Sequence, residues 1–239
     1  MNREVKAIRS YSGVIPSALN PGVVAGFALT RELQDMMVIT GASGTGKTCA
    51  ARYYQQTTLG VWLVTMTPAS SNLACCLSRV ARAMGIEDEP HRVARLEEAI
   101  VSRALGTGGL LIVDEAQHLR VAALEGLCRL QDQAQIGIVI MGGETFDARL
   151  TNWTWRTCTP IGRFLALELP EEGDVTRLLA AWDVPCGVRE LCHWISRQRG
   201  ALHALKSILR AAMFMADNEE QELNESHIKA AWCDLRERA

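Results

Sequence analysis

Four short apolar segments alternate with longer stretches of helical periodicity along the first part of the chain. The apolar segments, which are rich in β-branched residues, lie at residues 36–40, 61–66, 110–113 and 136–141. Between them, apolar side chains recur every three or four residues over 47–56, 71–84, 93–105 and 122–132. Such spacing is typical of helices with one buried face. Because strands that alternate with helices form parallel sheets, the pattern predicts an α/β fold.

The second part of the chain turns from this alternation to helical patterns alone. A fifth strand is predicted at 162–169. Three helices are predicted after it, at 188–199, 202–216 and 225–236. Asn224 is expected to cap the last helix, and Asp217 and Asn218 to end the one before it. The sequence therefore predicts a five-stranded parallel sheet flanked by helices and followed by a small helical lid.

A glycine-rich segment connects the first predicted strand to the first predicted helix. Residues 41–48 read G-A-S-G-T-G-K-T and match the spacing G-x-x-x-x-G-K-[ST], in which glycines let backbone N–H groups surround phosphates. Lys47 is expected to reach the β and γ phosphates, and Thr48 to offer its hydroxyl to Mg²⁺. We therefore predict ATP and Mg²⁺ as cofactors. Nucleotide binding is assigned to Gly41, Ala42, Ser43, Gly44, Thr45, Gly46, Lys47, Thr48 and Cys49.

Two carboxylates end the third predicted strand, which reads G-G-L-L-I-V-D-E at 108–115. Asp114 is predicted to hold Mg²⁺ together with Thr48 at the carboxyl edge of the sheet. Glu115 is predicted to orient or deprotonate an attacking water, so that Lys47 and Glu115 are candidate catalytic residues. A solvated acidic turn is the alternative, but the order of the two motifs along the chain favours ATP hydrolysis.

Two groups of arginines are candidates for binding phosphates outside this site. Arg156 and Arg163 follow the fourth predicted strand, where a guanidinium can reach a nucleotide on a neighbouring subunit and stabilise transition-state charge. Five further arginines are predicted to contact DNA, namely Arg79, Arg82, Arg92, Arg95 and Arg103. The alternative for the five is a solvated helix face, because acidic residues are interleaved with them.

The composition is that of a folded protein without a membrane segment. The 239 residues are 48% hydrophobic and carry a formal net charge of −2, so any DNA contact requires a local basic patch. No stretch approaches the roughly 18 uninterrupted apolar residues that cross a membrane, and residues 1–10 lack an apolar signal segment. Eight scattered cysteines form no C-x-x-C pair. We expect a cytoplasmic protein whose thiols are mostly reduced, with no membrane partner and no metal besides magnesium.

Three further segments accompany the phosphate loop: V-W-L-V-T-M-T-P at 61–68, L-I-V-D-E-A-Q-H-L at 111–119 and I-G-I-V-I-M-G at 136–142. With these segments the chain resembles the MuB group of ATP-dependent target-DNA activators of transposition, which is related to TnsC and TniB within the AAA+ P-loop ATPases. The resemblance implies the strand order 5-1-4-3-2. It also implies ATP-dependent assembly of rings or filaments on double-stranded DNA and delivery of that DNA to a transposase. We accordingly divide the chain into an arm with an entry helix (1–30), a nucleotide-binding domain (31–183) and a helical lid (184–239).

The sequence departs from this group at three places. MuB-like chains carry an asparagine after the fourth strand that senses the γ-phosphate, and this chain has Gly143 there, so sensing is expected to be weak or moved. His203 stands where the lid usually carries an arginine as second sensor. The chain also begins close to the ATPase core, so its DNA contacts are expected within the ATPase domain.

Two other functions remain open on the sequence alone. A helicase loader of the IstB or DnaC kind shares the same core and would depend on a helicase instead of a transposase. A nucleotide switch that hydrolyses ATP negligibly and selects protein partners is the other alternative, and it is favoured by the altered sensors.

Overall fold

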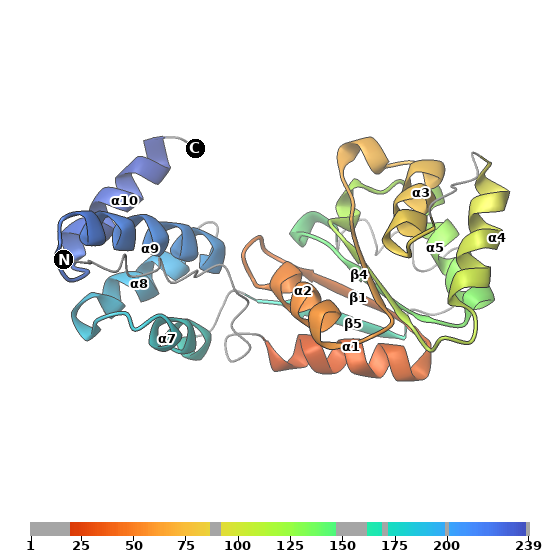
Figure 1. The fold of residues 1–239 in the computed structure, drawn as a ribbon, viewed down its shortest axis with the longest axis horizontal. Coiled ribbons are helices and arrows are strands. Elements are labelled where there is room, and N and C mark those ends of the chain that lie inside the picture. The colour runs from red at the N-terminus through yellow and green to blue at the C-terminus, as the bar shows by residue number, and fades with distance from the viewer. Residues whose placement is uncertain (1–19, 87–91, 147–161, 169–171, 199–200, 238–239) are drawn as a thin grey trace, which may run out of the picture. The chain divides into compact units, whose positions relative to one another are not determined.

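The chain forms two compact units, an α/β unit and a helical unit. The computed structural model describes residues 20–86, 92–146, 162–168, 172–198 and 201–237. The α/β unit contains residues 20–42 and 47–168, and the helical unit contains the helices that follow (Figure 1). Each unit has its own hydrophobic core.

Five parallel strands form the sheet of the α/β unit. They are β1 Met36–Gly41, β2 Val61–Thr65, β3 Leu110–Asp114, β4 Gly137–Met141 and β5 Arg163–Leu167. Their order is β2-β3-β4-β1-β5, and every neighbouring pair runs parallel. The predicted α/β fold and the implied strand order are therefore confirmed. Because all strands run the same way, their carboxyl ends meet at one edge of the sheet, where parallel α/β folds bind ligands.

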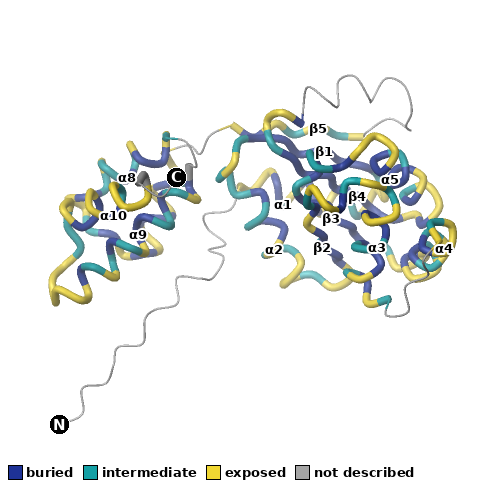
Figure 2. Tube along the Cα trace, turned by 90° about the horizontal axis from the view of Figure 1, so that it is seen from above, coloured by how far each residue is buried: buried dark blue, intermediate teal, exposed yellow. Residues whose placement is uncertain are grey.

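Helices cover both faces of this sheet. On one face α3 Leu73–Ala83, α4 Val93–Ala104 and α5 Val121–Ala134 pack against one another. On the other face lie α1 Pro21–Leu33 and α2 Lys47–Thr57, which also contact each other (Figure 1). The strands β1, β3 and β4 are buried along their whole length (Figure 2), as expected for the centre of a sheet covered twice.

The close packing of α1 on the sheet depends on a glycine. Ile138 and Ile140 point into the core formed with α3, α4 and α5, so Gly137 faces the opposite side, because side chains alternate along a strand. A Cβ atom at position 137 would lie 2.6 Å from the carbonyl oxygen of Thr30 in α1. The missing side chain therefore lets the helix backbone approach β4. The predicted entry helix is thus part of the α/β unit.

The described helices of the helical unit pack around a separate core. They are α7 Glu172–Ala181, α8 Arg189–Ser196, α9 Ala201–Asn218 and α10 Glu225–Glu237, with the short 3₁₀ turn η4 Cys186–Val188 before α8. Leu178 and Leu179 of α7 are fully buried in this core together with Leu205 of α9. Helix α7, which precedes the predicted domain boundary at residue 183, buries its apolar face among the helices that follow it.

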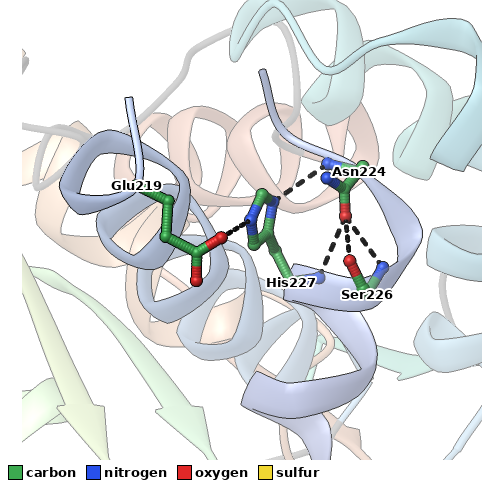
Figure 3. Close-up of polar contacts among 4 residues, drawn as sticks. All are labelled: Glu219, Asn224, Ser226 and His227. Atoms are coloured by element: carbon green, nitrogen blue, oxygen red, sulfur yellow. Dashed lines mark hydrogen bonds and ion pairs between the residues drawn. The ribbon is translucent and has the colours of Figure 1, made fainter. Parts of the chain in front are cut away.

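The connection between α9 and α10 follows the predicted stop and cap (Figure 3). Helix α9 ends at Asn218, and the side-chain oxygen of Asn224 accepts hydrogen bonds from the backbone N–H groups of Ser226 (2.9 Å) and His227 (3.2 Å). The buried His227 ring accepts the N–H of Asn224 at Nδ1 (3.3 Å), so its proton lies on Nε2, which faces Glu219 at 3.1 Å. This network joins the end of α9 to the start of α10.

Candidate nucleotide-binding site

The glycine-rich segment after β1 leads directly into helix α2. Strand β1 ends at Gly41 and α2 begins at Lys47. Gly44 and Gly46 adopt φ angles of +87° and +92°, which glycine accommodates at little cost and other residues rarely adopt. The loop therefore places the positive end of the α2 dipole at the carboxyl edge of the sheet, where it favours an anion.

Gly41 anchors the start of this loop against the neighbouring strand. Its φ is +154°, and a Cβ atom there would lie 2.7 Å from the carbonyl oxygen of Leu167 in β5. The first glycine of the motif is therefore required by a backbone-to-backbone contact. This contact brings the loop directly against the carboxyl end of β5.

Lys47 is held over the loop that precedes it. Its Nζ donates hydrogen bonds to the carbonyl oxygens of Gly41 (2.8 Å) and Ala42 (2.9 Å), and the residue is only 9% exposed. Burial lowers the pKa of Lys47, while the negative charges of Asp114, Glu115 and Glu144 oppose this shift. The ammonium group thus lies against the loop backbone, and the negative charges of three acidic side chains act on it.

Thr48 and Asp114 meet directly. The Thr48 hydroxyl donates a hydrogen bond of 2.7 Å to Oδ2 of Asp114, and the N–H of Glu115 donates to Oδ1 at 3.0 Å. Burial raises the pKa of Asp114, whereas these two hydrogen bonds lower it. A hydroxyl and a buried carboxylate are oxygen ligands of the kind that Mg²⁺ uses beside phosphates and water. The two residues therefore fit the predicted magnesium site.

Glu115 turns the chain sharply after β3. Its backbone is left-handed, with φ 58° and ψ 37°, and the 3₁₀ turn η3 Ala116–His118 follows at once. For a residue with a side chain this conformation is uncommon, and such residues concentrate at functional sites. The Glu115 carboxylate accepts a hydrogen bond from Nε2 of Gln117. Gln117 also accepts one from the N–H of Gly143, which follows β4.

Sequence reasoning missed Gln117, although it quoted the segment that contains it. The only signal was a polar side chain two positions after the carboxylate pair, and such side chains are common in turns. His118 ends the 3₁₀ turn. Cys49 lies half-buried in the first turn of α2. His203 lies exposed on α9 in the helical unit, and its role as a sensor stays a prediction.

Arg163 lies at the far end of the sheet from the loop. It begins β5 opposite Met37, whereas Gly41 pairs with Leu167 at the other end of the same two strands. Four residues of strand span about 13 Å, so this arginine does not belong to the phosphate site of its own subunit. One of its terminal nitrogens, Nη1, is buried without a hydrogen-bond partner in the described part of the chain. Arg156 lies outside the described residues.

The five candidate DNA arginines have different surroundings. Arg79 donates hydrogen bonds to the carbonyl oxygen of Thr65 (2.8 Å) and the hydroxyl of Thr67 (3.4 Å), and so fastens α3 to the end of β2. Arg95 forms a salt bridge of 3.2 Å with Glu98 on α4. The remaining three are exposed on or next to the adjacent helices α3 and α4: Arg82, Arg92 and Arg103. Contact with DNA stays a prediction for all five.

The described residues contain neither a cluster of typical metal ligands nor a membrane-spanning helix. None of their histidines, cysteines and acidic residues gather in groups of three or more that can enclose a metal ion. Within the same ranges, no helix is both long enough and apolar enough to span a bilayer.

Sequence comparison relates both units to known proteins. Residues 30–150 match the family model of an AAA domain, and residues 160–235 match that of the C-terminal part of the Mu B transposition protein. The chain is 34% identical over 209 residues to the ATP-dependent target DNA activator B of Escherichia phage Mu, covering 84% of this chain and 67% of the phage protein. It is 33% identical over 153 residues to the Mu-like prophage FluMu DNA transposition protein B of Haemophilus influenzae, covering 62% of this chain and 53% of that protein.

Solved structures share the fold at low sequence identity. The ADP form of the Aeropyrum pernix ORC2 protein superposes with a TM-score of 0.65 at 16% identity, covering 92% of this chain and 71% of that one. Domain III of the Thermotoga maritima replication initiation protein DnaA gives a TM-score of 0.58 at 15% identity, covering 92% and 98%. The chain therefore has the fold of the AAA+ P-loop ATPases and belongs to the family of Mu B transposition proteins.

Proposed function

We propose that the chain is an ATPase that binds double-stranded DNA in an ATP-dependent assembly and presents it to a transposase. The observation that carries the proposal is the contact between Thr48 and Asp114 beside Lys47, because it joins the two phosphate motifs at one edge of the sheet. The phage Mu relative, named an ATP-dependent target DNA activator, supports the role in transposition.

In the proposed reaction each residue has a separate task. The loop and Lys47 bind the phosphates of ATP, and Thr48 and Asp114 hold Mg²⁺, which neutralises phosphate charge when bound. Glu115 accepts a proton from water while the water oxygen attacks the γ-phosphorus and the bond to ADP breaks. An arginine of a neighbouring subunit, Arg156 or Arg163, stabilises the charge that develops on the transferred group.

The DNA part of the proposal rests on assembly. A subunit with a few arginine contacts binds DNA phosphates weakly at physiological salt, so many subunits must bind together to supply the affinity. The exposed residues Arg82, Arg92 and Arg103 are the contacts proposed for this purpose. We expect binding to be insensitive to DNA sequence and to weaken steeply as salt is raised.

The first experiment is sedimentation and negative-stain imaging of the protein on duplex DNA, without nucleotide and with ADP, ATP or a slowly hydrolysed ATP analogue. We expect rings or filaments on the DNA only when ATP or its slowly hydrolysed analogue is present. Lys47→Ala, which removes the phosphate-binding ammonium, should abolish them. Equal DNA binding under all four conditions, or assembly of Lys47→Ala like the parent, would overturn the proposed coupling.

A second candidate is a nucleotide switch that scarcely hydrolyses ATP. It is favoured by the absence of a side chain at Gly143, where a residue could sense the γ-phosphate. Glu115→Gln separates the two functions. In an ATPase this substitution traps an ATP-bound assembly and stops turnover, whereas in a pure switch it changes little.

A further inference from the structure

The carboxylate of Glu115 is tied to the end of a different strand through one side chain. Gln117 donates from Nε2 to Glu115 and accepts at Oε1 from the N–H of Gly143, at 3.2 Å in the second case. Gly143 follows β4, which is the neighbour of β3 in the sheet. The amide of Gln117 therefore bridges two adjacent strand ends at the edge where the phosphate loop lies.

Chemistry allows only one orientation of this amide. An ionised carboxylate accepts hydrogen bonds and cannot donate them, so the NH₂ group must face Glu115. A backbone N–H only donates, so the amide oxygen must face Gly143. Because each end of the amide has a partner of the opposite kind, rotation of the amide by half a turn would lose both hydrogen bonds. The Gln117 amide therefore has a single orientation between Glu115 and Gly143.

Glu115 requires such support because of its backbone. In its left-handed conformation the residue leaves the line of β3, so its carboxylate is not aligned by the strand. The neighbouring Asp114 is oriented by Thr48 and by the N–H of Glu115. Within the described residues, the Glu115 carboxylate accepts its side-chain hydrogen bond from Gln117.

We propose that Gln117 is a positioning residue for ATP hydrolysis, which holds the Glu115 carboxylate in place and links it to the end of β4. The inference rests on the proposed ATPase function. Gly143 has no side chain that could hold the Glu115 carboxylate. Gln117, which lies in the turn after the neighbouring strand β3, brings an amide to this carboxylate instead. A shift of the backbone at Gly143 would release the amide and with it the carboxylate, so the end of β4 controls the alignment of Glu115.

The test replaces Gln117 by leucine, which has a similar size and makes neither hydrogen bond. We expect kcat for ATP hydrolysis to fall about tenfold or more, while KM and the dissociation constant of an ATP analogue with Mg²⁺ stay within about twofold of the parent. Gln133→Leu, on the exposed side of α5, is the matched control and should retain the parental kcat. A loss of kcat at unchanged affinity separates positioning of Glu115 from nucleotide binding.

A double-mutant cycle then asks whether Gln117 acts through Glu115. In the Glu115→Gln background, Gln117→Leu should lower single-turnover hydrolysis no further, since there is no carboxylate left to position. Independent, additive losses would overturn the inference, as would a Gln117→Leu variant with parental kcat or one whose loss lies in KM.

A third variant covers the case in which Gln117→Leu does not fold. Gln117→Glu keeps the length of the side chain and an acceptor for the Gly143 N–H, but places an acceptor against Glu115. We expect the same loss of kcat at unchanged nucleotide affinity, and parental turnover in this variant would also contradict the inference. If the parent itself shows no hydrolysis, the proposed ATPase function fails, which is a different result from an active parent with active Gln117 variants.

Discussion

Thr48 is the residue on which the magnesium part of the proposed site depends. Its hydroxyl contacts a carboxylate that lies 66 positions further along the chain, and both oxygens have the chemistry of Mg²⁺ ligands. Lys47, next to it, is proposed to supply positive charge to the phosphates whether or not the metal is bound. Substitutions of these neighbouring residues should therefore differ in how they depend on magnesium.

We expect Thr48→Ala to weaken ATP binding about tenfold or more in the presence of Mg²⁺ and to have little effect in its absence, because a metal ligand is lost while the loop remains. Titration of a fluorescent ATP analogue with and without chelator measures both affinities. Thr57→Ala is the control, since that hydroxyl bonds Tyr53 at the exposed end of the same helix. Equal weakening with and without Mg²⁺ would rule out a metal-binding role for Thr48.

Two adjacent cysteines of α3 should differ in reactivity. Cys75 is exposed, whereas Cys76 is fully buried, and burial raises the pKa of Cys76 to about 12. Only the thiolate reacts with alkylating reagents, so at pH 8 iodoacetamide should modify Cys75 and leave Cys76 intact until the protein is denatured. Mass spectrometry of the digested protein measures both. Modification of Cys76 in the folded protein at the rate of Cys75 would show that this face of α3 is not buried.

Contacts between elements determine where the site residues lie. Helix α1 approaches β4 through Gly137, and Arg79 of α3 holds the end of β2 through Thr65. These contacts keep the helical layers in register with the sheet whose carboxyl edge carries Lys47 and Asp114. A change that separates a helix from its strand is therefore expected to lower the stability of the α/β unit.

Gly137→Ala tests the packing of α1. A methyl group at this position would collide with the carbonyl oxygen of Thr30, and overpacking of this kind typically costs about 1–3 kcal/mol. The matched control is Gly143→Ala at the other end of the same strand, where an added Cβ meets nothing within 4 Å and the change in stability should be about 0.5 kcal/mol or less. Urea unfolding measures both free energies. Equal stability of the two variants would contradict the close contact between α1 and β4.

At the scale of the whole molecule, two separate cores imply that the α/β unit and the helical unit can be destabilised independently of each other. Leu205 is fully buried in the core of the helical unit. Leu205→Ala should destabilise that unit by about 2–5 kcal/mol and accelerate hydrogen exchange in α7–α10, while β1–β5 keep their protection. Mass spectrometry of exchanged peptides locates the effect. Leu59→Ala, at a side chain that is 92% exposed, is the control. If Leu205→Ala accelerated exchange in both units, the molecule would instead unfold as a single cooperative structure.

The fold could be predicted from the sequence to a large extent because buried strands and covering helices leave local periodic patterns. The cap at Asn224 is equally local, since the capping oxygen bonds groups two and three positions away. The phosphate loop and the pair Asp114 and Glu115 were found as motifs because their chemistry requires fixed residue types at fixed spacing.

What could not be predicted depends on contacts between distant segments. Gln117 became visible only when β4 brought Gly143 beside the turn that follows β3. The apolar face of α7 does not reveal in the sequence which core will bury it, and the structure places Leu178 and Leu179 in the core of the helical unit. For Arg79 the charge suggested DNA, and the structure shows a partner in the backbone of Thr65 that no pattern of charges indicates.

The contact between Gly41 and Leu167 couples the phosphate loop to the end of β5. Gly41 begins the phosphate loop, and Leu167 ends the strand from which the chain leaves for the helical unit. Gly41 has no side chain to separate the two backbones, so the start of the loop and the end of β5 cannot shift independently of each other. Because Leu167 pairs with Gly41 at the ends of β5 and β1, a nucleotide that changes the shape of the loop is expected to shift the carboxyl end of β5 as well.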